Sequence, residues 1–149
     1  MNSLIVILIV VISDQLSKYY ISHVLLPQMS VPVIPQIFHI TYILNAGAAF
    51  GILENKRLLF IIIALFILAG VGYFYRKIPQ QYRLFRLGIG LMAGGAIGNL
   101  IDRIATGYVI DFFDFRIWPV FNIADMAIVC GVIMMIYTIL FMKKEAEMG

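Results

Sequence analysis

Two aspartates, Asp111 and Asp125, lie 14 positions apart in the apolar and aromatic stretch GYVIDFFDFRIWPVFNIAD, residues 107–125. Neither has a cation at helical spacing, and the Trp-Pro pair between them lets the chain double back, so that the two carboxyl groups can meet. Two adjacent carboxyl groups share a proton, because both cannot ionise cheaply. One can then draw a proton from water while the other polarises a carbonyl group. The pair predicts peptide hydrolysis without a metal ion, and Asp114 competes with Asp111 on chemistry alone.

Other polar residues have partners at helical spacing. Asp14 and Lys18 are four positions apart, so they lie on one helix face and neutralise each other. Asn99, Asp102 and Arg103 place an amide, a carboxylate and a guanidinium group on one face of another helix. Such a face can hold a peptide backbone or a carboxylate by directed hydrogen bonds. A purely structural pair between Asp102 and Arg103 is the alternative.

Four apolar segments carry or flank these residues, and each is close to the ~20 residues that a helix needs to cross a bilayer. They are residues 4–20, 58–75, 84–105 and 121–142. The chain is 62% hydrophobic, above the ~45–50% of soluble domains, so we expect lipid to be its solvent. Its 149 residues predict one domain, 1–149, of the all-α membrane class with four transmembrane helices.

Two local patterns concern the helices themselves. Gly90, Gly94 and Gly98 form a stripe of small residues that predicts close helix packing in the third segment. Residues 1–13 have no cation before the apolar run and no small-residue cleavage site after it. We therefore expect a retained membrane segment there instead of a signal peptide.

The distribution of cations predicts how the helices are oriented. The link between the second and third segments contains Arg76, Lys77, Arg83 and Arg86 and no acid, and Lys143 and Lys144 follow the last segment. Because cytoplasmic loops are rich in Lys and Arg, we expect both chain ends in the cytoplasm. The linkers 21–57 and 106–120 then face outward. Five of the eight acidic residues gather on that side, with Asp14 expected toward the outer end of the first span.

The first outer linker has a pattern typical of strands. Residues 37–44 alternate in period two, Pro32 and Pro35 precede them, and NAGAAFG follows at 45–51. This pattern predicts a short strand system that ends in a tight glycine turn. We expect these strands at the membrane interface, between the first and second helices.

The composition argues against several other kinds of site. Cys130 is the only cysteine, so the chain has neither a disulfide nor a paired-cysteine metal site. His23 and His39 lack companion ligands at metal spacing. The net charge of +3 comes from cations that flank apolar segments, which does not favour nucleic acid as a partner. We expect no metal, no cofactor and no nucleic acid.

Five motifs together resemble the ordered sequence blocks of lipoprotein signal peptidase, also called signal peptidase II. They are DQLSK at 14–18, NAGAAFG at 45–51, GGAIGNLIDR at 94–103, GYVIDF at 107–112 and FNIAD at 121–125. The resemblance covers almost the whole chain. It implies a four-helix aspartic protease of the bacterial cytoplasmic membrane with an extracytoplasmic β-cradle before Asn45. Such enzymes cut the signal peptide from prolipoproteins, just before a cysteine that carries diacylglycerol.

The resemblance also implies roles for individual residues. It selects Asp111 and Asp125 as the catalytic pair, in preference to Asp114. The positions that line the site or hold substrate backbone are Asn45, Asn99, Asp102, Arg103 and Asn122, while Asp14 and Lys18 support the fold and site. Met126 departs from the family, which commonly has a small hydroxyl residue there, so the tuning of the neighbouring aspartate stays open.

The implied partners are a diacylglyceryl prolipoprotein, membrane lipid and cyclic peptide inhibitors of the globomycin kind, and we expect a monomer. Two other classes of membrane protein explain the sequence less well. A proton-coupled transporter predicts a carboxylate at the membrane midplane and an internal repeat, whereas the acids here cluster toward the outer ends. A structural subunit does not explain three asparagines that each lie near an aspartate or a glycine turn.

Overall fold

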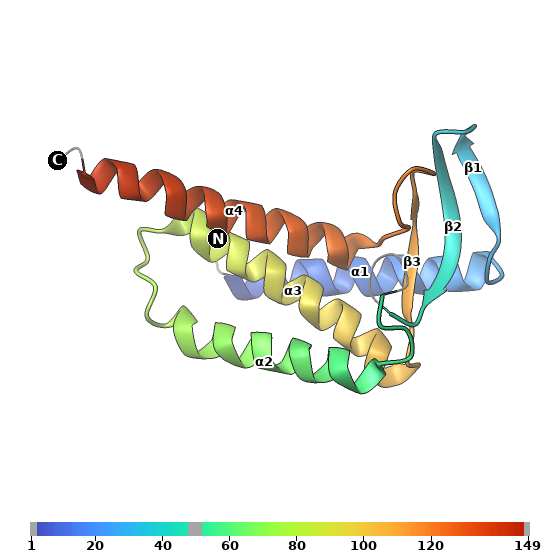
Figure 1. Cartoon of the computed structure of the whole chain (residues 1–149), viewed down its shortest axis with the longest axis horizontal. Coiled ribbons are helices and arrows are strands. Elements are labelled where there is room, and N and C mark those ends of the chain that lie inside the picture. Colours follow the sequence, from blue (N-terminus) through green and yellow to red (C-terminus); the bar gives the residue numbers. More distant parts are fainter. Residues whose placement is uncertain (1–2, 48–51, 148–149) are drawn as a thin grey trace.

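The computed structural model describes residues 3–47 and 52–147 and contains four helices and three strands in that part of the chain (Figure 1). The helices are α1 (Ser3–Val24), α2 (Arg57–Tyr75), α3 (Arg83–Ala105) and α4 (Ile123–Glu147). The strands are β1 (Ser30–Ile34), β2 (Phe38–Asn45) and β3 (Val109–Asp114). Each helix is long and apolar enough to cross a membrane. The sheet lies at one end of the helices, while the α2–α3 connection and the two chain ends lie at the other (Figure 1).

Helix α3 is the centre of the bundle, because its glycines let two neighbours approach closely. A Cβ atom at Gly94 would lie 2.8 Å from the Cβ of Val10 on α1, and one at Gly90 would lie 3.1 Å from that of Val6. On another face, a Cβ at Gly88 would lie 2.6 Å from the carbonyl oxygen of Gly131 on α4. The predicted glycine stripe therefore packs α3 against α1, and further glycines pack it against α4.

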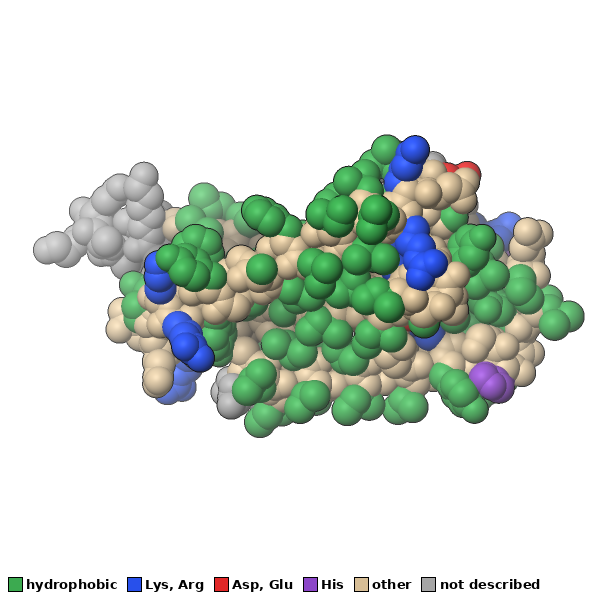
Figure 2. All heavy atoms as spheres, turned by 90° about the horizontal axis from the view of Figure 1, so that it is seen from below, with side chains coloured by type: hydrophobic (Ala, Val, Ile, Leu, Met, Phe, Trp, Pro, Cys, Tyr) green, Lys and Arg blue, Asp and Glu red, His purple; other side chains and the backbone are tan. Residues whose placement is uncertain are grey.

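Helix α2 lies at the edge of the bundle and buries none of its residues. It exposes large side chains such as Leu58, 69% exposed, and Phe66, 80% exposed. Apolar side chains also cover the middle of the face drawn in Figure 2, between two groups of Lys and Arg side chains. In water such a surface would drive aggregation, whereas a bilayer solvates it.

Helix α1 is longer than the predicted segment, since it continues to Val24. Its last turn packs onto the sheet, where Ile21 and Leu25 form a buried cluster with Tyr42 and Phe112. This extension corrects one expectation. Asp14 lies in the middle of α1 instead of toward its outer end, because apolar contacts with the sheet prolong the helix.

The sheet is antiparallel and has the order β1-β2-β3. The alternating pattern predicted strands between the first two helices, and β2 confirms the core of that pattern. The third strand comes from the linker between α3 and α4, where the sequence pattern predicts none. Part of the predicted glycine turn, residues 48–51, lies outside the described residues.

Strand β3 presents its two aspartates to opposite faces, because Asp111 and Asp114 are three positions apart in extended chain. A β-bulge separates their surroundings further. Ile40 pairs with Phe113 and Ile43 pairs with Asp111, so two residues of β2 oppose one residue of β3. The strand thus places the two acids in different surroundings.

Candidate active site

Asp125 is held by the way in which α4 begins. The side-chain oxygen of Asn122 accepts a hydrogen bond from the backbone N–H of Asp125 at 2.9 Å. In return, Asp125 Oδ2 accepts one from the backbone N–H of Asn122 at 3.2 Å. This reciprocal arrangement is a capping box, in which the two side chains satisfy backbone groups at the helix start. The FNIAD motif therefore orients a carboxyl group as a consequence of starting a helix.

Asp111 is held by two asparagine side chains. Asn122 Nδ2 donates to Asp111 Oδ1 at 2.7 Å, and Asn45 Nδ2 donates to Asp111 Oδ2 at 2.8 Å. Asn45 is the last residue of β2, and its own side-chain oxygen accepts the N–H of Gly47 at 2.9 Å, which fixes its direction. Asn122 therefore touches both aspartates and joins the end of the sheet to the start of α4.

A third asparagine completes the set of donors. Asn99 Nδ2 donates to Asp125 Oδ1 at 2.7 Å. Each of the four carboxyl oxygens of Asp111 and Asp125 thus accepts one N–H group. The donors are neutral amides in every case. A neutral donor stabilises a carboxylate less than a cation does, so such a site is able to keep a proton.

The surroundings of Asp111 raise its pKa to near neutral pH. Burial raises the pKa of Asp111 from 3.8 to about 7, and the negative charge of Asp125 acts in the same direction. The hydrogen bonds from Asn45 and Asn122 oppose this rise but do not cancel it. Near neutral pH this carboxyl group is therefore present in both its protonated and its ionised form.

A buried lysine lies directly behind the pair. Lys18 Nζ contacts Asp14 Oδ2 at 2.8 Å, Asp102 Oδ2 at 2.9 Å and Asn99 Oδ1 at 2.9 Å. All three ammonium hydrogens are used, and Lys18 is only 2% exposed. Because an ammonium group only donates, Asn99 must offer it the amide oxygen. Its NH₂ group is then left to face Asp125, so the lysine sets the direction of that donor.

The two acids that pair with Lys18 also anchor the chain around the cavity. Asp14 Oδ1 accepts the backbone N–H of Ala124 at 3.0 Å, and Asp102 Oδ2 accepts that of Ile110 at 3.2 Å. These contacts attach the start of α4 and strand β3 to α1 and α3. Gln15, which the sequence analysis missed, donates to Asp102 Oδ1 at 3.0 Å. Its place inside the DQLSK motif was the available signal.

Arg103 does not pair with its sequence neighbour. The ion-pair partner of Asp102 is Lys18, which argues against the structural Asp102–Arg103 pair considered from the sequence. Arg103 Nη2 instead donates to the carbonyl oxygen of Gly47 at 3.0 Å, and its guanidinium lies 4.7 Å from the ring centre of Phe60. The arginine therefore reaches across from α3 to the segment after β2.

A cavity of about 280 Å³ brings these groups together. Asn45, Asn99, Arg103, Asp111 and Asp125 line its polar side. The apolar wall of the cavity comes from the chain between β3 and α4 and from the first turns of α4, with Trp118, Pro119, Val120, Phe121, Ile128 and Val129. The remaining candidates, Asp14, Lys18, Asp102 and Asn122, are buried behind the polar wall. None of these apolar residues is among the site residues that the sequence predicts.

Asp114 lies in a different environment on the same strand. Thr41 Oγ1 donates to Asp114 Oδ2 at 2.7 Å, and Arg116 Nη1 lies 2.9 Å from the same oxygen. Burial alone would raise the pKa of Asp114, but the contacts with Thr41 and Arg116 lower it below its ordinary value. Asp114 is thus an ionised, paired residue and is absent from the cavity lining.

The remaining polar candidates lie outside the cavity. His23 Nδ1 is 2.8 Å from the carbonyl oxygen of Tyr19, and His39 Nδ1 is 3.0 Å from Ser30 Oγ. Cys130 is a free, exposed thiol on α4. Among residues 3–47 and 52–147, no three His, Cys, Asp or Glu side chains are grouped as metal ligands.

Fold and cavity together define a multi-pass membrane protein with two carboxyl groups in one polar cavity at the junction of the helices and a small sheet. The chain belongs to the signal peptidase II family, whose model, "Signal peptidase (SPase) II", matches residues 6–141. This membership confirms the resemblance drawn from the sequence motifs. The family is one of proteases, which are hydrolases.

Relatives and solved structures agree with this membership. The lipoprotein signal peptidase of Moorella thermoacetica is 51% identical over 97% of both chains. That of Pelotomaculum thermopropionicum is 46% identical over 91% of this chain and 90% of its own. Two solved structures described as bacterial membrane enzymes have TM-scores of 0.87 and 0.84 at 40% and 42% identity. They cover 97% and 93% of this chain, and the chain covers 90% and 92% of theirs.

Proposed function

We propose that this protein is an aspartic endopeptidase that removes the signal peptide from diacylglyceryl-modified prolipoproteins, cutting before the lipid-bearing cysteine. Family membership supports prolipoproteins as the substrate class. The observation that carries the catalytic assignment is the cavity that holds Asp111 and Asp125 together, with each carboxyl oxygen bound to one amide N–H.

The raised pKa supports distinct roles for the two acids. Asp111 in its protonated form donates to the scissile carbonyl oxygen, and Asp125 takes a proton from the attacking water. The water oxygen bonds to the carbonyl carbon and forms a neutral diol. Asp125 then gives its proton to the leaving nitrogen as the carbon–nitrogen bond breaks, and Asp111 recovers its proton from the diol. The products are a carboxyl group on the signal peptide and a free amine on the lipidated cysteine.

The cavity walls support this substrate. Arg103 and Asn45 border the carboxyl groups and hold the peptide backbone, as their donor groups allow. Trp118, Phe121 and Val129 belong to the apolar wall, which receives acyl chains and the apolar signal helix. Membrane lipid surrounds the rest. We propose that cyclic peptides of the globomycin kind compete for this cavity and that the protein acts as a monomer.

The proposed location is the bacterial cytoplasmic membrane, with the sheet and cavity toward the outer face. The connection between α2 and α3 lies at the opposite end of the molecule, together with both chain ends (Figure 1). This connection and the helix turns beside it contain Arg76, Lys77, Arg83 and Arg86. Loops rich in Lys and Arg favour the cytoplasmic side. Both termini are then cytoplasmic, and the sheet forms an extracytoplasmic cradle beside the cavity.

A cleavage assay tests the catalytic assignment. A lipidated precursor is incubated with the purified protein and with its Asp111→Asn and Asp125→Asn variants, and the product is resolved on a gel. Each variant should insert normally but lose activity by about 10³-fold, because general acid–base catalysis is removed. Near-normal turnover by either variant would show that the pair is wrongly assigned. A chelator should leave turnover of the parent protein unchanged, since the proposed chemistry uses no metal.

A further inference from the structure

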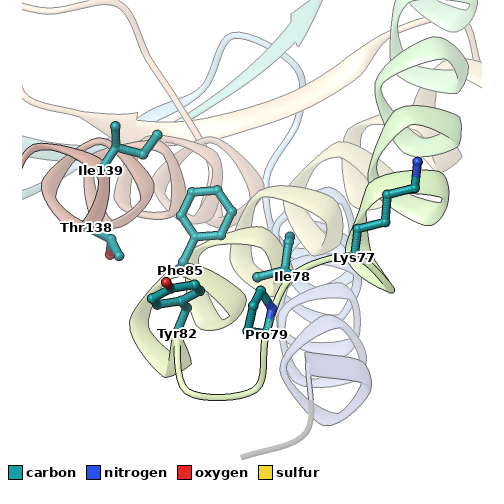
Figure 3. A pocket seen from close by; sticks show the side chains of 7 residues that line it. All are labelled: Lys77, Ile78, Pro79, Tyr82, Phe85, Thr138 and Ile139. Carbon is teal, nitrogen blue, oxygen red and sulfur yellow. The ribbon is translucent and has the colours of Figure 1, made fainter. Parts of the chain in front are cut away.

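Two adjoining cavities lie at the end of the bundle away from the carboxyl groups, between the α2–α3 connection and the second half of α4. The first has a volume of about 450 Å³ and is mainly apolar (Figure 3). In Figure 3, Thr138 and Ile139 of α4 lie across from Tyr82 and Phe85. The second, of about 480 Å³, is more polar and adds Gln81 and Arg83. Tyr82 and Thr138 line both, so we treat the two cavities as one surface, the turn groove.

The α2–α3 connection that walls the turn groove carries cations and no acid. Arg76, Lys77, Arg83 and Arg86 fall within 11 positions, and no acid lies among them. Figure 2 shows Lys and Arg side chains gathered at the corresponding end of the molecule. The ion pairs found among the described side chains involve Lys18 and Arg116, both outside this region. The positive charge at the groove is therefore not neutralised by a described carboxylate.

The contacts that two of these cations make are with neutral groups. Lys77 Nζ lies 3.0 Å from the hydroxyl of Tyr73 and 4.2 Å from the centre of its ring. The guanidinium of Arg86 lies 4.2 Å from the ring centre of Tyr75. Aromatic and hydroxyl partners orient a cation without cancelling its charge. The electrostatic complement of this surface is therefore an anion.

Hydrogen bonds fix the chain segments that wall the groove. Arg86 Nη1 donates to the carbonyl oxygen of Ile78 at 2.8 Å, which fixes the connection that walls the apolar cavity. The carbonyl oxygen of Arg86 accepts from Ser3 Oγ at 2.9 Å, and the hydroxyl of Tyr75 donates to Ser3 Oγ at 2.7 Å. A site whose walls are fixed before binding loses less entropy when a ligand enters.

We propose that the turn groove binds one anionic phospholipid of the surrounding membrane. An acyl chain occupies the apolar cavity beside Phe85 and Ile139, and the phosphate group lies at the polar cavity against Arg83 and Gln81. Basic pockets between membrane helices suit anionic head groups, and a guanidinium group binds phosphate oxygens in pairs. The adjoining apolar cavity favours a lipid over free phosphate, because only a lipid fills both halves.

Lipid retention by the purified protein tests the charged half. The protein is exchanged into nanodiscs of equal phosphatidylglycerol and phosphatidylcholine, extracted in mild detergent, and analysed for bound lipid by native mass spectrometry. We expect phosphatidylglycerol to be retained in preference, and Arg83→Gln to reduce that preference about tenfold, as the loss of one charge-assisted hydrogen bond does. Lys56→Gln is the matched control, because it removes an exposed cation before α2, at the other end of the molecule.

A second pair of variants tests the apolar half and keeps the proposal falsifiable if Arg83→Gln fails to fold. Ile139→Trp fills the groove, whereas Ile133→Trp changes an equally exposed residue of the same helix outside it; both isoleucines are 59% exposed. Only Ile139→Trp should lower retention. The proposal would be overturned by equal retention of the two lipids or by an equal loss of retention in the control variants. It would also be overturned if inorganic phosphate displaced the bound lipid equally well from the parent protein and from Ile139→Trp. Cleavage is not measured, so the proposed function stands or falls separately.

Discussion

Strand β3 carries two buried acids whose surroundings differ in kind. Asp111 is bound by the neutral amides of Asn45 and Asn122, and burial raises its pKa to about 7. Asp114, three positions further on, is bound by Thr41 and by the guanidinium of Arg116, and its pKa is lowered. Burial acts in the same direction on both. At Asp111 burial outweighs the hydrogen bonds from the asparagines. At Asp114 the hydrogen bonds from Thr41 and Arg116, together with the charge of Arg116, outweigh burial, so one acid keeps a proton near neutral pH and the other remains an anion.

The largest expected difference between the surroundings of Asp111 and those of Asp114 is in the activity of the variants that replace each acid by its amide. Asp111→Asn is expected to lower cleavage about 10³-fold, as proposed above. Asp114→Asn should keep activity within about tenfold of the parent, because that side chain is outside the cavity. Initial rates on a lipidated precursor measure both. An inactive Asp114→Asn variant that folds and inserts normally would make Asp114 the partner of Asp125 instead.

The cation behind the cavity should matter more for stability than the cation beside Asp114. Lys18→Met leaves Asp14 and Asp102 buried without their counter-charge, which should cost about 3–5 kcal/mol of unfolding free energy. The midpoint of a denaturation titration in detergent measures this loss. Lys56→Gln, which removes an exposed cation, serves as control. A midpoint unchanged by Lys18→Met would contradict a stabilising role of the two buried ion pairs.

The pH dependence of cleavage should show how the neutral amide donors affect the pKa of Asp111. If protonated Asp111 is the acid, the rate falls as pH rises through about 7, because that proton is lost. Removing a donor to its carboxylate form raises the pKa, so Asn45→Ala should move this falling limb to higher pH by about one unit. Thr41→Ala, which removes the equivalent donor from Asp114, should leave the limb in place. A limb moved equally by both variants would contradict the separation of the two acids.

The smallest effect is expected at the exposed cation. Arg116 is 48% exposed, so solvent screens its pair with Asp114, and Arg116→Gln should cost only about 0.5 kcal/mol of unfolding free energy. The pKa of Asp114 is lowered in the folded state, so its stabilising contribution is complete above the ordinary carboxyl pKa and is lost as the pH falls. The difference between Arg116→Gln and parent should therefore vanish in acid. A difference that persists there would point to lost packing.

Some features of the site could be predicted from short stretches of sequence. The FNIAD stretch contains the Asn and Asp of the capping box at the spacing that a helix start requires, and the i,i+4 spacing of Asp14 and Lys18 is realised as an ion pair. Both depend on neighbours a few positions apart. The partner of Asp102 could not be predicted in this way, since Lys18 lies on another helix.

The backbone pairing of strand β3 could not be predicted from local sequence either. Its residues were expected in a linker, because a six-residue apolar run with aspartates has no regular polar alternation. It forms a strand because the edge of β2 pairs with it and the last turn of α1 packs on Phe112. Those contacts come from residues that are about 70 and 90 positions away in the sequence, where local patterns carry no information.

The sequence by itself determined that the chain has four apolar helices, which family it belongs to, and which polar residues stand out against the apolar background. Composition and local spacing suffice to predict these features, because lipid exposure depends on the single residue and helix periodicity depends on neighbours a few positions apart. Only the tertiary structure decided which carboxyl groups share a cavity and which meet a cation. That outcome depends on a β-bulge, on the glycine contacts of α3 and on one buried lysine, each of which joins elements far apart in the chain.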